Sequence, residues 1–196
     1  MAAPQLAQFV GRTPRFKALN DLHVLFDHRG IFVILPWTLR RGLQIGILRR
    51  LYGAQYSALV ELCTSESCFF RTLFPIVNYL YIFESSPPLY WLESTESSQW
   101  LELLHPFTAV KDLYLSKEFA LYIVPALLGS VGEEVTEVLP ALRNLFFESI
   151  PSPRPVEEIS RQFVAARQLS SHQIAISYWD VERDKTDKLY NHKDAF

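Results

Sequence analysis

The sequence is poor in the features that mark secreted, membrane-spanning and nucleic-acid-binding proteins. Its 196 residues include two cysteines, Cys63 and Cys68, too few for a disulfide framework. No stretch approaches the 18 or so consecutive apolar residues of a transmembrane helix, and the N-terminus lacks the basic start and apolar run of a signal peptide. The formal net charge of −2 gives no general attraction for polyanions. We therefore expect an intracellular protein, cytoplasmic or nuclear, that binds neither nucleic acid nor membrane.

Motifs for catalysis, cofactor binding and metal binding are also missing. No Gly-rich phosphate loop follows a predicted strand, and no Gly-x-Ser-x-Gly motif occurs. None of the five histidines stands four residues from another, and the two cysteines lack the second ligand pair of a zinc site. We therefore expect a protein that is not an enzyme and that has no cofactor and no metal. The alternative is a small α/β enzyme with an unrecognised site, in which residues such as Glu102, His105 and Cys63 converge.

The sequence does contain a six-residue apolar pattern that recurs about every thirty residues. Its copies are Val77-x-x-Leu80-x-Ile82, Val110-x-x-Leu113-x-Leu115 and Leu142-x-x-Leu145-x-Phe147. Their central leucines are 33 and 32 residues apart, and a weaker copy ends at Ile174-x-Ile176, with Ile174 a further 29 residues along. Self-similarity at a fixed period is typical of stacked strand–helix units, and such solenoids usually bind other molecules.

Segments with helical spacing separate these copies. Apolar residues recur at helical intervals in residues 100–107, after Ser116, and in residues 156–169. Connections of this length that contain a helix imply parallel strands. Nearer the N-terminus, a β-rich run passes through the turn-type residues 27–30 into residues 31–35, which predicts a β-hairpin, and residues 43–47 predict another strand.

Together these patterns predict an α/β fold with a leucine-rich-repeat-like stack of parallel strands and helices. We expect a short curved solenoid with an N-terminal β-hairpin, and a doubly wound α/β sheet is the structural alternative. Residues 1–180 would form this single domain. Residues 181–196 are dominated by charged and polar side chains, and we expect a flexible C-terminal tail there.

Several segments carry a resemblance to a known family. They are residues 100–120 (WLELLHPFTAVKDLYLSKEFA), 136–148 (TEVLPALRNLFFE) and 162–170 (QFVAARQLS), with earlier parts in residues 12–20 (RTPRFKALN) and 57–63 (SALVELC). The chain, over roughly Gln5 to Asp180, resembles the C-terminal half of an expanded family of F-box proteins from mushroom-forming fungi. The resemblance implies a non-enzymatic protein-interaction domain, the part of a ubiquitin-ligase receptor that holds the protein target.

An F-box itself, with a Leu-Pro-x-Glu-like opening, does not precede the repeats in this sequence. Engagement of a ligase adaptor is therefore doubtful. A truncated or orphan product without a selected partner is a further alternative to the interaction domain.

The strand residues between the core positions supply the candidate binding surface. In a Leu-x-Leu alternation the middle residue faces the opposite side of the sheet. These residues are Tyr81, Tyr114 and Phe146, and His23 and Gln44 extend the row if the strands are in register. Because aromatic residues are enriched in interaction hot spots, we predict that this row contacts the partner, unless loops or the tail cover the rings. The predicted flanking polar contacts are Asp112, Asn144 and Glu148.

Overall fold

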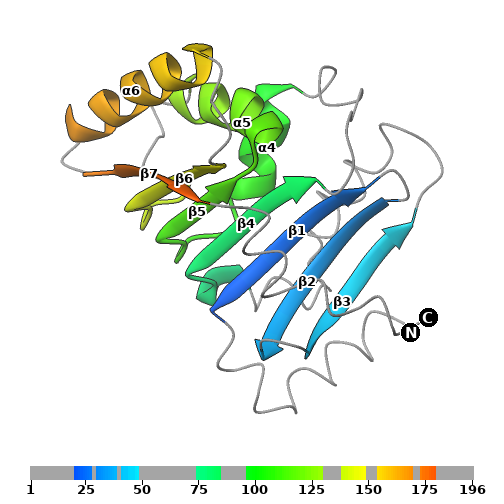
Figure 1. The fold of residues 1–196 in the computed structure, drawn as a ribbon. Coiled ribbons are helices and arrows are strands. Elements are labelled where there is room, and N and C mark those ends of the chain that lie inside the picture. The colour runs from blue at the N-terminus through cyan, green and yellow to red at the C-terminus, as the bar shows by residue number, and fades with distance from the viewer. Residues whose placement is uncertain are drawn as a thin grey trace.

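The strands of this protein form one mixed sheet, with order β3-β2-β1-β4-β5-β6-β7 (Figure 1). The computed structural model describes residues 20–27, 30–38, 41–48, 74–84, 96–129, 138–148, 154–169 and 173–179. The strands are β1 (Asp21–Asp27), β2 (Gly30–Thr38), β3 (Arg41–Leu48), β4 (Tyr79–Glu84), β5 (Asp112–Leu115), β6 (Asn144–Glu148) and β7 (Ala175–Trp179). The helices are the short 3-10 helix η2 (Phe74–Ile76) and the α-helices α4 (Ser97–Leu104), α5 (Lys117–Gly129) and α6 (Arg154–Leu169).

Five strands of the sheet are parallel and lie side by side in the order of the chain. β1 pairs with β4, β4 with β5, β5 with β6, and β6 with β7, all parallel. β2 pairs antiparallel with both β1 and β3, which confirms the predicted hairpin and the strand after it. The predicted tail, residues 181–196, lies outside the described residues.

All three described α-helices lie over the same face of the sheet (Figure 1). A doubly wound sheet would carry helices on both faces. The described part of the chain is therefore an α/β structure with a five-stranded parallel sheet covered on one side. None of these helices is long and apolar enough to cross a membrane.

The hydrogen-bond register aligns the apolar pattern across the parallel strands. Leu22, Leu80, Leu113, Leu145 and Ile176 form one row. Leu80, Leu113 and Leu145 agree with the predicted alignment, but the last position does not, because the partner of Leu145 is Ile176 and not the expected Ile174. The amide of Ala175 donates to the Arg143 carbonyl (2.8 Å), and this bond sets the register of β7 two residues later than apolar spacing indicated.

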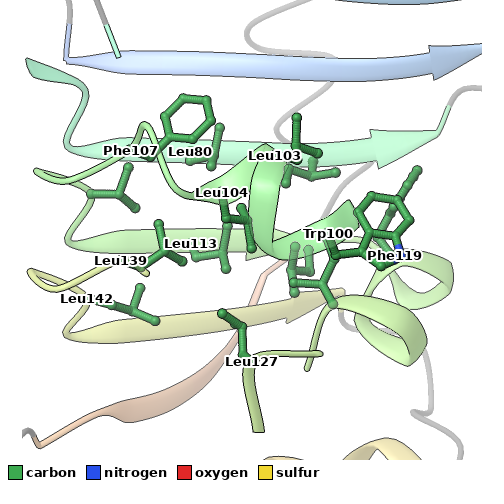
Figure 2. Close-up of a cluster of buried hydrophobic side chains, with 14 of the residues drawn as sticks. Leu80, Trp100, Leu103, Leu104, Phe107, Leu113, Phe119, Leu127, Leu139 and Leu142 are labelled. Atoms are coloured by element: carbon green, nitrogen blue, oxygen red, sulfur yellow. The ribbon is translucent and has the colours of Figure 1, made fainter. Parts of the chain in front are cut away.

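The helix-facing side chains form the main core. All nine apolar residues in the three strong copies of the pattern are at most 4% exposed. Leu103 and Leu104 of α4 lie over the strands that carry Leu80 and Leu113, and Trp100 lies beside Phe119 of α5 (Figure 2). Burying a leucine of this kind contributes about 1.5–3 kcal/mol.

Backbone hydrogen bonds hold the starts of the strands together. The Asn20 carbonyl accepts from the amides of Asn78 (2.8 Å) and Tyr79 (2.9 Å). The Asn78 carbonyl accepts in the same way from the amides of Lys111 and Asp112. The Lys111 carbonyl in turn accepts from the amides of Arg143 and Asn144. This repeated arrangement of two donors and one carbonyl aligns each strand with its neighbour at the end of the sheet where the parallel strands begin. It therefore determines which side chains share a row.

Candidate functional site

The face of the sheet opposite the helices carries a row of stacked rings. His23, Tyr81, Tyr114 and Phe146 come from four adjacent strands and share one register row. Their successive ring centroids are 4.3, 4.1 and 4.3 Å apart, and the ring planes differ by 15°, 13° and 5°. The spacing follows from the separation of roughly 4.8 Å between strands, which brings side chains of one row into stacking distance.

This row confirms the predicted register of Tyr81, Tyr114 and Phe146, with His23 as its extension. The backbone register continues the row through Ile34 to Gln44, on the hairpin side. The rings of the row, together with Leu25, Phe83 and Trp179, are called the aromatic face below.

The rings of the aromatic face are unequally covered. Tyr81 is 4% exposed and His23 is 2% exposed, whereas Tyr114 and Phe146 are half-buried. A surface that contacts a partner through rings therefore has Tyr114 and Phe146 available, while Tyr81 supports them from within the stack.

Trp179 contributes to this covering, and sequence analysis missed its role. Its ring stands edge-on to Tyr81 (5.7 Å, 62°) and to Tyr114 (5.4 Å, 75°). Its indole Nε1 donates to the Leu115 carbonyl (3.2 Å), which ties the end of β7 to the end of β5. The apolar pattern contained no sign of this contact, because Trp179 follows the last copy and reaches across β6.

A polar row lies beside the rings at the starts of the strands. Tyr79, Asp112, Asn144 and Ala175 share one register row, two residues before the ring row, and therefore belong to the same face. Asn144 Nδ2 donates to Asp112 Oδ1 (2.6 Å), and both residues are half-buried. Tyr79 is 37% exposed. The predicted flanking residues Asp112 and Asn144 are thus adjacent to the ring row.

A second polar group lies where the strands end. Glu84, Ser116 and Glu148 are spaced 32 residues apart, one on each successive strand or just after it. The Ser116 hydroxyl donates to Glu84, and the Lys117 amide donates to Glu148 Oε2 (3.1 Å). Ser116 directly precedes α5, but the side-chain acceptor for the first amide of this helix comes from Glu148 of β6. A carboxylate is favourable there because the helix N-terminus is partially positive.

These carboxylates also affect one another. Burial raises the pKa of Glu84, and the charges of Glu148 and Glu118 raise it further, while the hydrogen bond from Ser116 acts in the opposite direction. Glu148, the third predicted flanking residue, is the last residue of β6. It lies at the opposite end of the strands from Asp112 and Asn144, which are the first residues of β5 and β6.

Other polar residues considered as site candidates are dispersed. Glu102 and His105 are both exposed at the end of α4, and Cys63 lies outside the described residues. Within the described ranges, no three histidine, cysteine, aspartate or glutamate side chains gather as a metal site would require.

Arg167 of α6 is a buried charge that the amphipathic pattern did not predict. It is 1% exposed, its Nη2 donates to the Val138 carbonyl (2.9 Å), and its guanidinium lies 5.5 Å from the Phe163 ring centroid. Burial lowers the pKa of Arg167. These contacts attach α6 to the segment that leads into β6, on the helix side of the sheet, so they are structural.

Comparisons of this chain with protein-family models, curated proteins and solved structures gave no match.

Proposed function

We propose that this chain is a non-enzymatic protein-interaction domain that binds a protein target across the aromatic face. It would be a leucine-rich-repeat-like solenoid, as in the target-binding part of the F-box receptors that the sequence resembles. Parallel strands in chain order, about 32 residues apart and with helices on one side, support this view. In such stacks the strand side opposite the helices is the usual binding surface.

The observation that carries the proposal is the partial exposure of Tyr114 and Phe146 within an ordered stack. Rings held by neighbours on adjacent strands lose little conformational freedom on binding, so they suit the role of anchors. Asp112 and Asn144 on one side of the rings and Glu148 on the other supply hydrogen-bonding groups around an apolar centre, which is the usual arrangement of a protein interface.

The test is affinity capture from an extract of a mushroom-forming fungus. The bait proteins are the wild type, a Tyr114→Ala/Phe146→Ala double variant, and a Tyr178→Ala control. Tyr178 is 57% exposed, and its register partner Phe147 places it on the helix side of the sheet. This control therefore removes an exposed aromatic ring from the face that is not proposed to bind. Urea unfolding establishes that each bait is folded.

We expect the double variant to lose proteins that the wild type and Tyr178→Ala both retain. Each anchor ring contributes about 1–4 kcal/mol to binding, so the loss should be nearly complete. If the folded double variant captures every protein that the wild type captures, the aromatic face is not the binding surface.

A further inference from the structure

The strand β7 forms one edge of the described sheet, and alternate residues along it point their backbone groups away from the sheet (Figure 1). The Ala175 amide donates to the Arg143 carbonyl, so Ala175 and every second residue after it direct their amides and carbonyls toward β6. Ile176 and Tyr178 therefore direct theirs outward, where β7 has no neighbour among the described strands. A row of outward backbone groups is a template for pairing with another strand.

This edge is accessible and lacks the features that keep edge strands from pairing. Ala175 is exposed, and Tyr178 is 57% exposed on the helix side, so α6 leaves this part of β7 open. β7 contains no proline and no charged residue. The other edge strand of the described sheet, β3, begins with Arg41 and pairs with β2 through an irregular register. Of these two edges, β7 is the one suited to accept another strand.

The order of the side chains in β7 makes this strand complementary to itself. In an antiparallel pair with a two-fold axis at Ser177, Ile176 of one copy lies opposite Tyr178 of the other, and the two exchange both backbone hydrogen bonds. The axis repeats this pair and gives four bonds, whereas an axis at Ile176 or Tyr178 gives only two within β7. On the opposite face Ala175 lies across from Trp179, a small side chain beside a large one, and the two copies of Ser177 meet at the axis.

We propose that two copies of this chain associate through β7, antiparallel and with the two-fold axis at Ser177. A second copy is the occupant that this edge fits, because the strand matches itself residue by residue and carries no charge that would repel its copy. The two sheets would join into one sheet with both aromatic faces on the same side, since the axis is perpendicular to the sheet. The pairing uses the backbone edge of β7, so it is independent of the proposed binding of a protein target.

An engineered disulfide tests both the association and its register. Cys63→Ser and Cys68→Ser are introduced first, and oxidised glutathione is the oxidant, so that each disulfide formed reduces one glutathione disulfide to two thiols. Opposite residues in a non-hydrogen-bonded antiparallel pair have Cα atoms about 4.5 Å apart, which a disulfide can span. We therefore expect Ser177→Cys to give a covalent dimer of twice 22.7 kDa.

Ala175→Cys is the matched control for this cross-link. In the proposed register this position lies opposite Trp179 and about 13 Å along the strand from its own copy, at about 3.3 Å per residue. We expect no covalent dimer from Ala175→Cys under the same oxidation. Gel electrophoresis without reductant measures both variants.

Tyr178→Pro tests the backbone hydrogen bonds of the proposed pair. The Tyr178 amide points outward, so proline at this position removes a donor of the pair and no bond to β6. Tyr178→Ala lacks the same ring but keeps the amide. Sedimentation equilibrium from about 1 to about 200 μM should give a dimer dissociation constant for Tyr178→Pro at least about 10-fold above that of Tyr178→Ala. Urea unfolding establishes that both variants are folded.

Three results would overturn the proposal. They are a wild type that stays monomeric across this concentration range, a Tyr178→Pro variant that dimerises as well as Tyr178→Ala, and equal cross-linking of Ser177→Cys and Ala175→Cys. Should Tyr178→Pro fail to fold, the comparison of the two cysteine variants decides. The capture experiment with Tyr114→Ala/Phe146→Ala measures a different surface, so failure of the dimer and failure of the proposed function are distinguishable.

Discussion

The two faces of the sheet achieve burial by different means. On the helix face, aliphatic side chains such as Leu80, Leu113 and Leu145 are covered by a second layer of helices and are fully buried. On the aromatic face, rings from neighbouring strands cover one another within the sheet, with Trp179 across the stack. Mutual coverage of this kind buries His23 and Tyr81 but leaves Tyr114 and Phe146 half-buried. One backbone register therefore yields a face that is fully covered and a face on which two rings remain partly exposed.

The largest effect should come from the helix face. We expect Leu113→Ala to lower the free energy of unfolding by about 2–5 kcal/mol, because it removes a fully buried side chain and leaves a cavity beneath α4 and α5. Urea unfolding followed by circular dichroism measures this change. A loss below about 1 kcal/mol would mean that the helices do not cover this row as described.

The next effect separates a buried ring of the aromatic face from a half-buried one. Tyr81→Ala should cost about 2–4 kcal/mol of unfolding free energy, since Tyr81 is buried and contacts His23, Tyr114 and Trp179. Tyr114→Ala should cost about 1–2 kcal/mol, because its ring is half-buried. Equal losses for the two variants, measured by the same urea titration, would show that coverage is uniform along the row.

A smaller effect is expected in the polar row at the strand starts. Asn144→Ala removes the hydrogen bond to Asp112 and should lower the free energy of unfolding by about 0.5–1.5 kcal/mol. Lys111→Ala is the matched control, because this exposed side chain lies at the same edge and should change stability by less than about 0.5 kcal/mol. If Lys111→Ala lowers the free energy of unfolding as much as Asn144→Ala does, the hydrogen bond to Asp112 is not the cause of the loss.

The smallest effect concerns Glu84 and depends on pH. Its pKa is raised in the folded protein, first by burial, so the charged form is penalised on folding. The penalty is complete above the folded-state pKa and disappears as the pH falls toward the unfolded value of 4.5. Glu84→Gln should therefore be more stable than the wild type at about pH 7, and the difference should shrink toward pH 4.5. A difference that grows on acidification would contradict this assignment.

Sequence spacing was sufficient to predict the parallel strands and the row positions of β4, β5 and β6, but not the row position of β7. Leu80, Leu113 and Leu145 recur at nearly constant intervals, and an apolar residue at alternate positions must lie on one side of a strand. The ring row followed from the same alternation. The burial of Tyr81 did not, because it depends in part on Trp179, whose side chain reaches across β6 to contact Tyr81. The hydrogen bonds among Glu84, Ser116, Lys117 and Glu148 also join separate strands and helices, and no local pattern encodes them.

Because strand order equals chain order, no parallel pairing from β4 to β7 links positions more than 33 residues apart. The entropy of closing each connection is therefore nearly the same. No pairing among these strands requires the first strand to find the last. Folding can start at any of these pairings and spread in both directions along the stack. Among these four strands, β4 is also held by its pairing with β1, whereas β7 is at the edge of the described sheet, so partial unfolding of the stack should begin at β7.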